Sequence, residues 1–262
     1  LDANTTGATN VAVGNGAVGS NTTGIRLTGL GHGSLGSNTT GTRNVGVGYA
    51  ALNGNTTGQY NVGVGTGALQ TNTTGAEQVA VGYNSLYLNT TGNHNVAIGA
   101  SALYSNTTAT KSVGIGYYAL LSATTGGNNT AVGYRALDSV TDGHDNTGVG
   151  RDVLTAVTTG EKNTACGTSG QGITTGQNNL TLGYNAGSAA SPSGNITTGN
   201  DTICLGDNGI SNLFCADTSI SSSDSRDKTD VTSFNIGLDW IEALRPVTYR
   251  WDRRTWYGTD AE

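Results

Sequence analysis

The chain has 262 residues, among them 42 glycines and only 2 prolines, which excludes both a collagen-like triplet and a proline-rich linker. Charged residues make up 11% of it and the formal net charge is −6, so neither nucleic acid nor an anionic membrane surface is an expected partner. No apolar run approaches the ~18 residues of a membrane span, and no signal peptide is visible. Because the chain begins at Leu1 and has no methionine, we expect it to be a piece of a longer gene product.

A repeat of seventeen residues organises residues 1–210. Its first marker is the tetrad Asn-Thr-Thr-Gly, which begins at Asn4–Gly7 and decays in later copies; the last two copies end at Gly176 and Gly199, after steps of sixteen and twenty-three. The second marker is a glycine that keeps the period through ten copies, which excludes chance. These glycines are Gly14, Gly31, Gly48, Gly65, Gly82, Gly99, Gly116, Gly133, Gly150 and Gly167.

The residues between the two markers alternate as in a strand. The residues three and one before the second glycine are mostly Val, Ile, Leu or Thr, from Val11 and Val13 to Thr164 and Cys166, with only Ala or Gly between them. This period of two predicts a short strand. Four residues after the second glycine, a leucine column follows. Each repeat is thus predicted to form a short strand, a glycine turn, a second short segment and the Asn-Thr-Thr-Gly turn, and at both turns we expect glycine to adopt positive φ. The column comprises Leu35, Leu52, Leu69, Leu86, Leu103, Leu120, Leu137 and Leu154.

Units of this length cannot enclose a core, so they must stack. We predict an all-β fold: a parallel β-roll or β-solenoid of about twelve 17-residue coils, roughly 60 Å long at ~4.8 Å per coil. The few large apolar positions in each coil favour a parallel homotrimer, and the Ala/Gly column is expected to let another chain approach. Asparagines just before the strands are expected to form an amide ladder between coils. They are Asn10, Asn44, Asn61, Asn95, Asn129, Asn146 and Asn163.

Three runs carry a resemblance to known repeats. The segments 44–48 (NVGVG), 95–99 (NVAIG) and 129–133 (NTAVG) resemble the head repeats of trimeric autotransporter adhesins, and similar repeats occur in bacteriophage tail fibres. This resemblance implies trimeric, left-handed parallel β-rolls. The period here is longer than the usual adhesin unit, so we expect a different coil shape.

The composition changes near residue 210. Residues 1–210 contain 15 charged side chains and residues 211–262 another 15, together with both phenylalanines and all three tryptophans. The repeat is absent from the second part. We therefore predict two domains, a repeat β-solenoid shaft at 1–210 and the incomplete start of a second domain at 211–262.

The second domain resembles the start of the intramolecular chaperone of endosialidases and other phage fibres, the peptidase S74 family. The resemblance rests on the runs 223–231 (SDSRDKTDV), 237–241 (GLDWI) and 244–251 (LRPVTYRW), in this order. It implies a small α+β segment that folds the trimeric fibre and then cuts itself off. By this resemblance Ser223 would be the nucleophile and Lys228 its base, with the cut between Ser222 and Ser223.

A Ser–Lys pair of this kind is chemically reasonable, because a neutral lysine can accept the hydroxyl proton. Asp227 departs from the family pattern, which has an apolar residue there. A carboxylate beside Lys228 favours its charged form and weakens it as a base. Any enzymatic activity is expected to be at most this single-turnover self-cleavage.

Other candidate sites are interpreted as structural. The odd number of cysteines (Cys166, Cys204, Cys215) lacks C-x-x-C spacing, and Cys166 is interpreted as a buried small hydrophobe. The Asn-Thr-Thr runs are interpreted as turns and not as glycosylation sites. We expect no metal or cofactor, since the histidines His32, His94 and His144 share no repeat position.

Two surface features remain. Tyrosines after the second glycine are interpreted as a structural ladder in preference to a sugar site. The acidic residues between positions 138 and 161 lie close together in the sequence, and their spacing fits exposed turns better than a glycosidase site. The first set is Tyr49, Tyr83, Tyr117, Tyr134 and Tyr184; the second is Asp138, Asp142, Asp145, Asp152 and Glu161.

The leading hypothesis is a structural, trimeric phage tail fibre whose shaft presents a host-attachment end. Its expected partners are its own copies, other tail or baseplate proteins, and a bacterial surface receptor, either a glycan or an outer-membrane component. It would be assembled in the host cytoplasm and lie in the virion tail, outside the cell after release. The alternatives are a fibre of a phage-like contractile injection system, an adhesin head of the trimeric autotransporter type, and a polysaccharide-cleaving tailspike.

Overall fold

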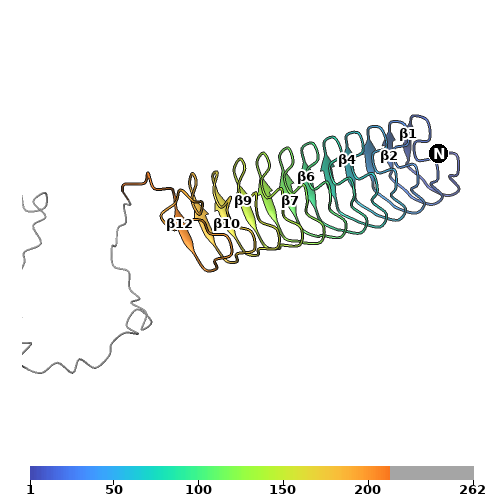
Figure 1. The fold of residues 1–262 in the computed structure, drawn as a ribbon. Coiled ribbons are helices and arrows are strands. Elements are labelled where there is room, and N and C mark those ends of the chain that lie inside the picture. Colours follow the sequence, from blue (N-terminus) through green and yellow to red (C-terminus); the bar gives the residue numbers. More distant parts are fainter. Residues whose placement is uncertain (213–262) are drawn as a thin grey trace, which may run out of the picture. The chain divides into compact units, whose positions relative to one another are not determined.

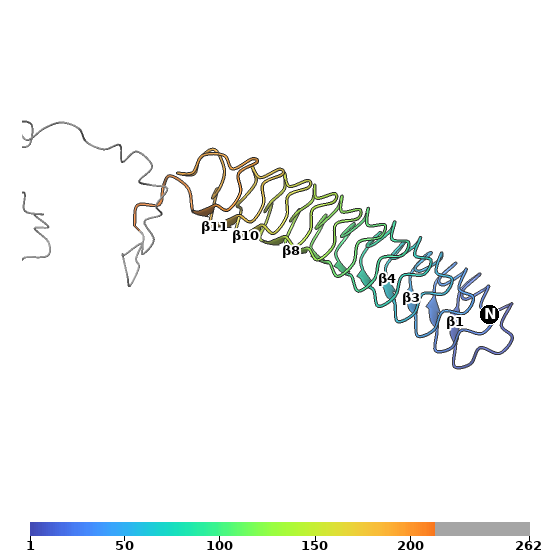
Figure 2. The same ribbon diagram turned by 90° about the horizontal axis from the view of Figure 1, so that it is seen from below.

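The computed structural model describes residues 1–212, which form a compact unit by themselves. They build an all-β parallel solenoid in which each coil contributes one three-residue strand to a single sheet (Figure 1; Figure 2). Within this range there is no helix. The predicted solenoid is thereby confirmed, whereas the predicted α+β segment lies outside the described residues. The strands are β1 (Val11–Val13), β2 (Thr28–Leu30), β3 (Val45–Val47), β4 (Val62–Val64), β5 (Val79–Val81), β6 (Val96–Ile98), β7 (Val113–Ile115), β8 (Thr130–Val132), β9 (Thr147–Val149), β10 (Thr164–Cys166), β11 (Leu180–Leu182) and β12 (Ile203–Leu205).

Every strand pairs in parallel only with the strands before and after it in the chain. The register follows the sequence period: β1 to β10 recur every seventeen residues, and steps of sixteen and twenty-three lead to β11 and β12. Backbone bonds join the coils outside the strands as well, for example from the Leu35 N–H to the Ala51 carbonyl at 2.9 Å. Each sequence repeat therefore forms one coil, and hydrogen bonds join each coil to the next.

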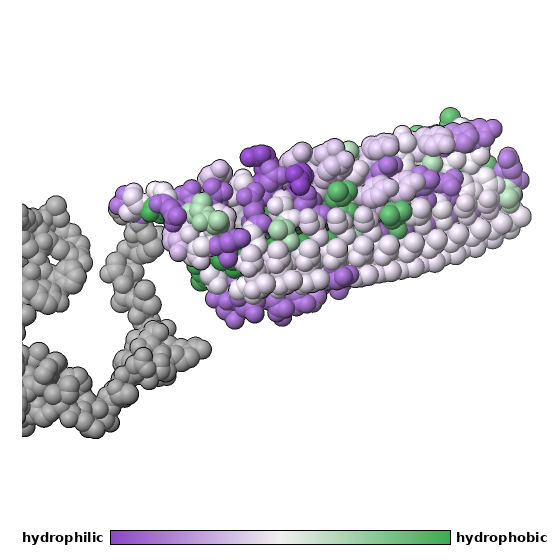
Figure 3. All heavy atoms as spheres, in the orientation of Figure 1, coloured by the Kyte–Doolittle hydropathy of each residue, from purple (hydrophilic) through white to green (hydrophobic). Residues whose placement is uncertain are grey.

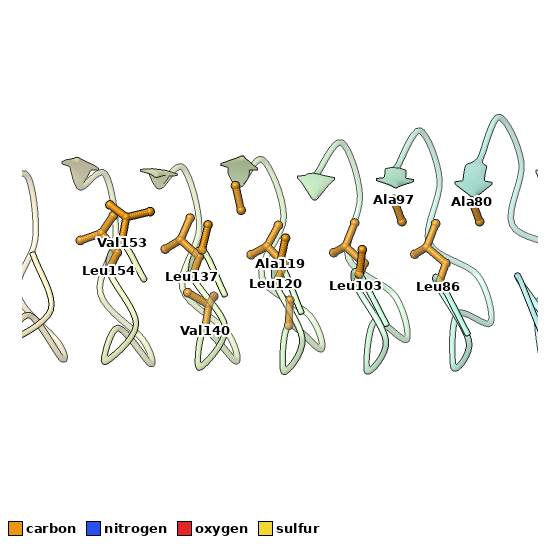
Figure 4. Close-up of a cluster of buried hydrophobic side chains, with 14 of the residues drawn as sticks. Ala80, Leu86, Ala97, Leu103, Ala119, Leu120, Leu137, Val140, Val153 and Leu154 are labelled. Atoms are coloured by element: carbon orange, nitrogen blue, oxygen red, sulfur yellow. The ribbon is translucent and has the colours of Figure 1, made fainter. Parts of the chain in front are cut away.

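The core is one narrow row of side chains inside the coils. The leucine column is fully buried, and in the regular coils the middle strand residues, such as Ala80 and Ala97, point at it from the opposite wall (Figure 4). A Cβ at Gly46 would lie 3.4 Å from Leu35 Cγ, and one at Gly63 would lie 3.3 Å from Leu52 Cγ. Small residues are required here because leucine already fills the coil. The prediction that the Ala/Gly column lets another chain approach is therefore wrong: this column faces inward.

Positive φ is confirmed at the turn after each of the first ten strands, where the second-marker glycines have φ between 91° and 141°, but not at the tetrad turn. The tetrad glycines do not adopt it, whereas the leucine column does, with φ of 54° at Leu35 and 51° at Leu154. Left-handed backbone costs a non-glycine residue roughly 1–2 kcal/mol, which burial of the leucine must offset. Glycine occupies the tetrad for another reason. A Cβ at Gly24 would lie 2.9 Å from the Asn38 amide nitrogen and closer still to the Gly41 carbonyl oxygen.

Two asparagine columns link the coils. In the column before the strands, Asn44 Oδ1 accepts the Asn61 N–H at 2.9 Å and Asn44 Nδ2 donates to the Gly58 carbonyl at 2.7 Å. The predicted amide-to-amide ladder forms only in the later coils of this column, for example from Asn163 Nδ2 to Asn146 Oδ1 at 3.1 Å.

A longer amide ladder, which we did not predict, runs through the tetrad asparagines. Each donates its Nδ2 to the Oδ1 of the previous coil's asparagine, from Asn21 to Asn4 at 2.8 Å up to Asn89 to Asn72 at 2.7 Å. The asparagines from Asn21 onward in this ladder are fully buried. A buried amide cannot serve as a glycosylation acceptor, so the interpretation of Asn-Thr-Thr as a turn is confirmed for these copies.

Candidate functional site

The predicted self-cleavage residues Ser223 and Lys228 lie outside the described residues, as does the bond between Ser222 and Ser223. The candidate surfaces of residues 1–212 are therefore the outside of the solenoid. Among these residues no helix is long and apolar enough to cross a membrane, and no group of three or more histidine, cysteine or acidic side chains is placed to hold a metal ion.

The most distinctive surface is the outer side of the sheet. We use the term sheet face for the first and third residues of all twelve strands, whose side chains point away from the coil interior. These 24 positions hold only Val, Ile, Leu, Thr and one Cys, with no charged residue. Several are well exposed, including Val13 (61%), Ile98 (40%) and Leu205 (42%). A continuous uncharged stripe of this length is unusual on a soluble surface and indicates an interaction site.

Cys166 lies on this sheet face. It is the third residue of β10 and is exposed, so its interpretation as a buried hydrophobe is wrong. The reason is the inward direction of the middle strand residue, which turns both flanking positions outward. Cys204, the middle residue of β12, is buried instead.

The Cys204 thiol is held in a polar pocket of the irregular last coil. Its Sγ accepts the Gly187 N–H at 3.1 Å and the Ser193 hydroxyl at 3.3 Å. Burial acts to raise the pKa of this thiol, but the hydrogen bonds from Ser191, Ser193 and the Gly187 backbone outweigh burial and lower the pKa. The segment that carries these donors accounts for the 23-residue step before β12.

Two rims border the sheet face. The upstream rim consists of the residues two positions before each strand, and the downstream rim of the residues two positions after it. The upstream rim is exposed and mostly polar or charged, as at Arg43, Glu77 and Lys111. The downstream rim contains all five predicted tyrosines, from Tyr49 (59% exposed) to Tyr184 (64% exposed).

The downstream tyrosines form a ladder only where neighbouring coils both carry a ring. Tyr117 stacks on Tyr134 with ring centroids 5.7 Å apart, and Tyr49 stacks on His32 at 5.4 Å. The ring centroids of Tyr117 and Tyr118 lie 3.9 Å apart. A hydrogen bond between their side chains is the main cause that raises the pKa of Tyr117. The structural-ladder interpretation is confirmed for these pairs, and all five tyrosines remain accessible to a partner.

The carboxylates near coil nine do not converge on one site. Asp138 Oδ2 accepts from Arg135 Nε at 2.7 Å, which is the main cause that raises the pKa of the Arg135 guanidinium. Asp138 is only 6% exposed, so its placement on an exposed turn is wrong; packing between coils encloses it. Asp152 shares Arg135 with Asp138, at 3.9 Å from Arg135 Nη1. It also accepts from Arg151 Nη1 at 3.0 Å.

The other acidic groups of this region bind other partners. His144 contacts Asp145 at 2.8 Å and Glu161 at 2.9 Å, and Asp142 accepts from the Thr125 hydroxyl. Each of these carboxylates is thus held by a neighbouring base or hydroxyl. This arrangement does not resemble the pair of facing carboxylates that glycoside hydrolysis requires.

Equivalent residues align along the whole unit, and Figure 3 shows the result as continuous rows of near-neutral hydropathy on the visible face. Sequence reasoning located the sheet-face residues but assigned the wrong residues to the outside. The useful signal was already present, because the flanking strand residues are never charged whereas the middle residue must fit beside leucine.

Comparisons with known proteins concern the C-terminal part of the chain. No curated protein and no solved structure matches this sequence. Residues 223–261 match the family model of Peptidase S74, described as chaperone of endosialidase. The match starts at Ser223, the residue that the resemblance assigns as nucleophile, and follows the solenoid by ten residues. A β-solenoid followed by an S74 chaperone match fits a tail-fibre-like protein.

Proposed function

We propose that the chain is part of a homotrimeric, tail-fibre-like structural protein, in which the solenoid is a shaft and the S74 segment an intramolecular chaperone. The observation that carries this proposal is the succession of a β-solenoid and the S74 match at residues 223–261. The solenoid supports a mechanical role, because every coil is bonded to the next through backbone, threonine and asparagine contacts.

The chaperone would act before the shaft is complete. Twelve parallel strands of three residues depend entirely on contacts between coils, and such non-local pairing folds slowly and exposes apolar edges meanwhile. Holding three chains together at one end raises their local concentration and favours parallel assembly. The S74 segment would supply this start point.

Self-cleavage would then release the chaperone. In the proposed step the Ser223 hydroxyl attacks the Ser222 carbonyl carbon while the neutral Lys228 amine takes the hydroxyl proton. The peptide bond to the Ser223 nitrogen breaks and that nitrogen is protonated. Water then hydrolyses the ester, which leaves a carboxylate on Ser222 and restores the Ser223 hydroxyl.

The shaft would present a distal end to a bacterial surface receptor while other tail or baseplate proteins hold the opposite end. In this proposal the protein is assembled in the host cytoplasm and works outside the cell, in a virion tail. A fibre of a contractile injection system would have the same architecture.

Intact mass of the full gene product expressed in a bacterium tests the proposal, with Ser223→Ala as the variant and Ser222→Ala as the matched control. We expect two fragments split before Ser223 from the native chain and from the control, and one uncut chain from Ser223→Ala. Light scattering of the same samples should give the mass of a trimer. A monomeric native protein would refute the trimeric shaft; uncut native chains in a trimer would refute only the cleavage.

A further inference from the structure

We infer that the sheet face is the interface between copies of this chain, which pack in parallel and in register with the upstream rim of one copy against the downstream rim of the next. This inference rests on the proposed trimer and assigns the surface that forms it.

The composition of the sheet face supports burial. All 24 positions are uncharged, and 19 of them are Val, Ile or Leu. Twelve strands at ~4.8 Å and three residues at ~3.3 Å give a face of about 58 Å by 10 Å, or about 580 Å² per copy. Because each face is divided between two neighbours, one pair of copies buries about 600 Å² in total, less than a standard specific interface, so the C-terminal segment must add to the association.

A second copy is the occupant because the stripe has the period of the coil itself. Two copies related by an axis parallel to the shaft place each coil beside the identical coil, so that no level of the stripe lacks a partner. A ligand whose repeat spacing differs from that of the coils would fall out of register with the strands within a few coils. The two outward columns of the strand also allow each copy to contact two neighbours, one through each column.

The rims bring one pair of opposite charges together at zero shift. In coil nine, Asp145 of one copy would meet Arg151 of the next, and both side chains are exposed. Within one copy Asp145 contacts His144 and Arg151 contacts Asp152. In coil five the pair is Glu77 with the Tyr83 hydroxyl, and in coil seven the Lys111 ammonium with the Tyr117 ring, which is an aromatic partner for a cation. A shift by one coil would instead place Lys162 against Arg151.

In the last described coil the two rim positions hold like charges, Asp201 and Asp207, which would repel each other between copies. The pairing therefore covers the regular coils and ends at the irregular one. An apolar centre with tyrosine, arginine and charged groups at its border is the composition of protein–protein interfaces.

Cys166 provides a reporter at the centre of the proposed interface. In the full chain with Cys204→Ser and Cys215→Ser, a bismaleimide with a short spacer should join Cys166 thiols of different copies into dimers on a denaturing gel. The matched control moves the thiol to the exposed tetrad edge of the same coil, with Cys166→Ser and Thr159→Cys, and should give no crosslink. Val149→Lys, next to Cys166 on the sheet face, should abolish the Cys166 crosslink.

A charge exchange tests the register. Asp145→Arg and Arg151→Asp alone should each raise the concentration at which the trimer half-dissociates by about tenfold, and the double exchange should recover most of it. The C-terminal segment can hold copies together without the sheet face. The mass of the assembly is therefore measured together with the crosslink, which reports on the sheet face alone. A native trimer that crosslinks through Thr159→Cys but not through Cys166 would overturn the inference and leave the proposed trimer intact. A native monomer would overturn both.

Discussion

The first seven coils and the last five differ at one column, although the same coil backbone continues across the boundary between them and becomes irregular only in the last two coils. In the first seven, the leading tetrad position is asparagine, and from Asn21 onward these side chains are fully buried. In the last five it is apolar: Ala123, Val140, Val157, Ile173 and Ile196. Strand pairing and the leucine column continue unchanged across this boundary. One coil geometry therefore accepts either a hydrogen-bonded ladder or a hydrophobic row at its corner.

The ladder loses one bond at Ala109, one coil before this boundary. A Cβ at Gly92, the equivalent glycine of the previous coil, would lie 2.5 Å from Asn89 Oδ1. Ala109 carries this Cβ, and there the bond from Asn106 Nδ2 to Asn89 Oδ1 is not made. Asn89 Oδ1 is therefore left as a buried acceptor without a protein donor, and Asn106 Oδ1 is left in the same state because the next coil carries Ala123 in place of an asparagine. The ladder thus weakens where glycine is replaced and ends where the leading position becomes apolar.

The largest expected effect tests what the two regions share. Leu69→Ala in the first region and Leu137→Ala in the second should each lower the free energy of unfolding by about 2–5 kcal/mol, because both leave a cavity in the same row. Urea unfolding followed by circular dichroism measures this loss. Clearly unequal losses would show that the leucine column does not serve both regions alike.

A somewhat smaller effect should separate the regions. Asn72→Ala removes the donor of Asn55 Oδ1 and the acceptor of Asn89 Nδ2. Leaving a buried acceptor unpaired costs about 1–3 kcal/mol beyond the lost side chain, so we expect a loss of about 3 kcal/mol. Val157→Ala, which removes only two methyl groups, should cost about 2 kcal/mol. If both cost the same in urea unfolding, the ladder adds nothing over apolar packing.

Restoring the ladder should give a small gain. Ala109→Gly removes the interfering Cβ and lets Asn106 Nδ2 reach Asn89 Oδ1, which is worth about 1–3 kcal/mol at a buried acceptor. The greater freedom of glycine in the unfolded chain offsets about 0.4–1 kcal/mol. Ala76→Gly, after an intact turn, carries only this offset and is the matched control. Ala109→Gly should therefore melt at a higher temperature than Ala76→Gly, and equal melting temperatures would contradict the mechanism.

The smallest effect concerns the rim. His94 Nε2 lies 3.3 Å from Glu77 Oε2, but both side chains are more than half exposed. Solvent screens such pairs, so Glu77→Gln should change the free energy of unfolding by less than about 0.5 kcal/mol. The polar rim of an interface remains accessible to solvent, so the same small effect is expected in the assembled trimer. A loss of several kcal/mol in the same urea assay would contradict this screening.

Much of the fold could be predicted from residues alone. The seventeen-residue period predicts the coil, the strand triplets predict the sheet and the leucine column predicts the core, because such short units can be buried only by stacking. The directions of side chains were harder. Cys166 was assigned to the inside because it occupies an apolar column, yet the triplet is so short that only its middle residue faces the core. The self-cleavage pair Ser223 and Lys228 remains a prediction from the resemblance.

The sequence by itself determined the period, the coil count and the position of the S74 match, since repetition and motif order are properties of the chain. The tertiary structure alone decided which face is inside, why the tetrad needs glycine, and where the asparagine ladder ends. These features depend on distances between residues seventeen apart, such as the approach of Gly24 to Gly41. Such distances arise only when coils lie against each other, and therefore no local pattern encodes them.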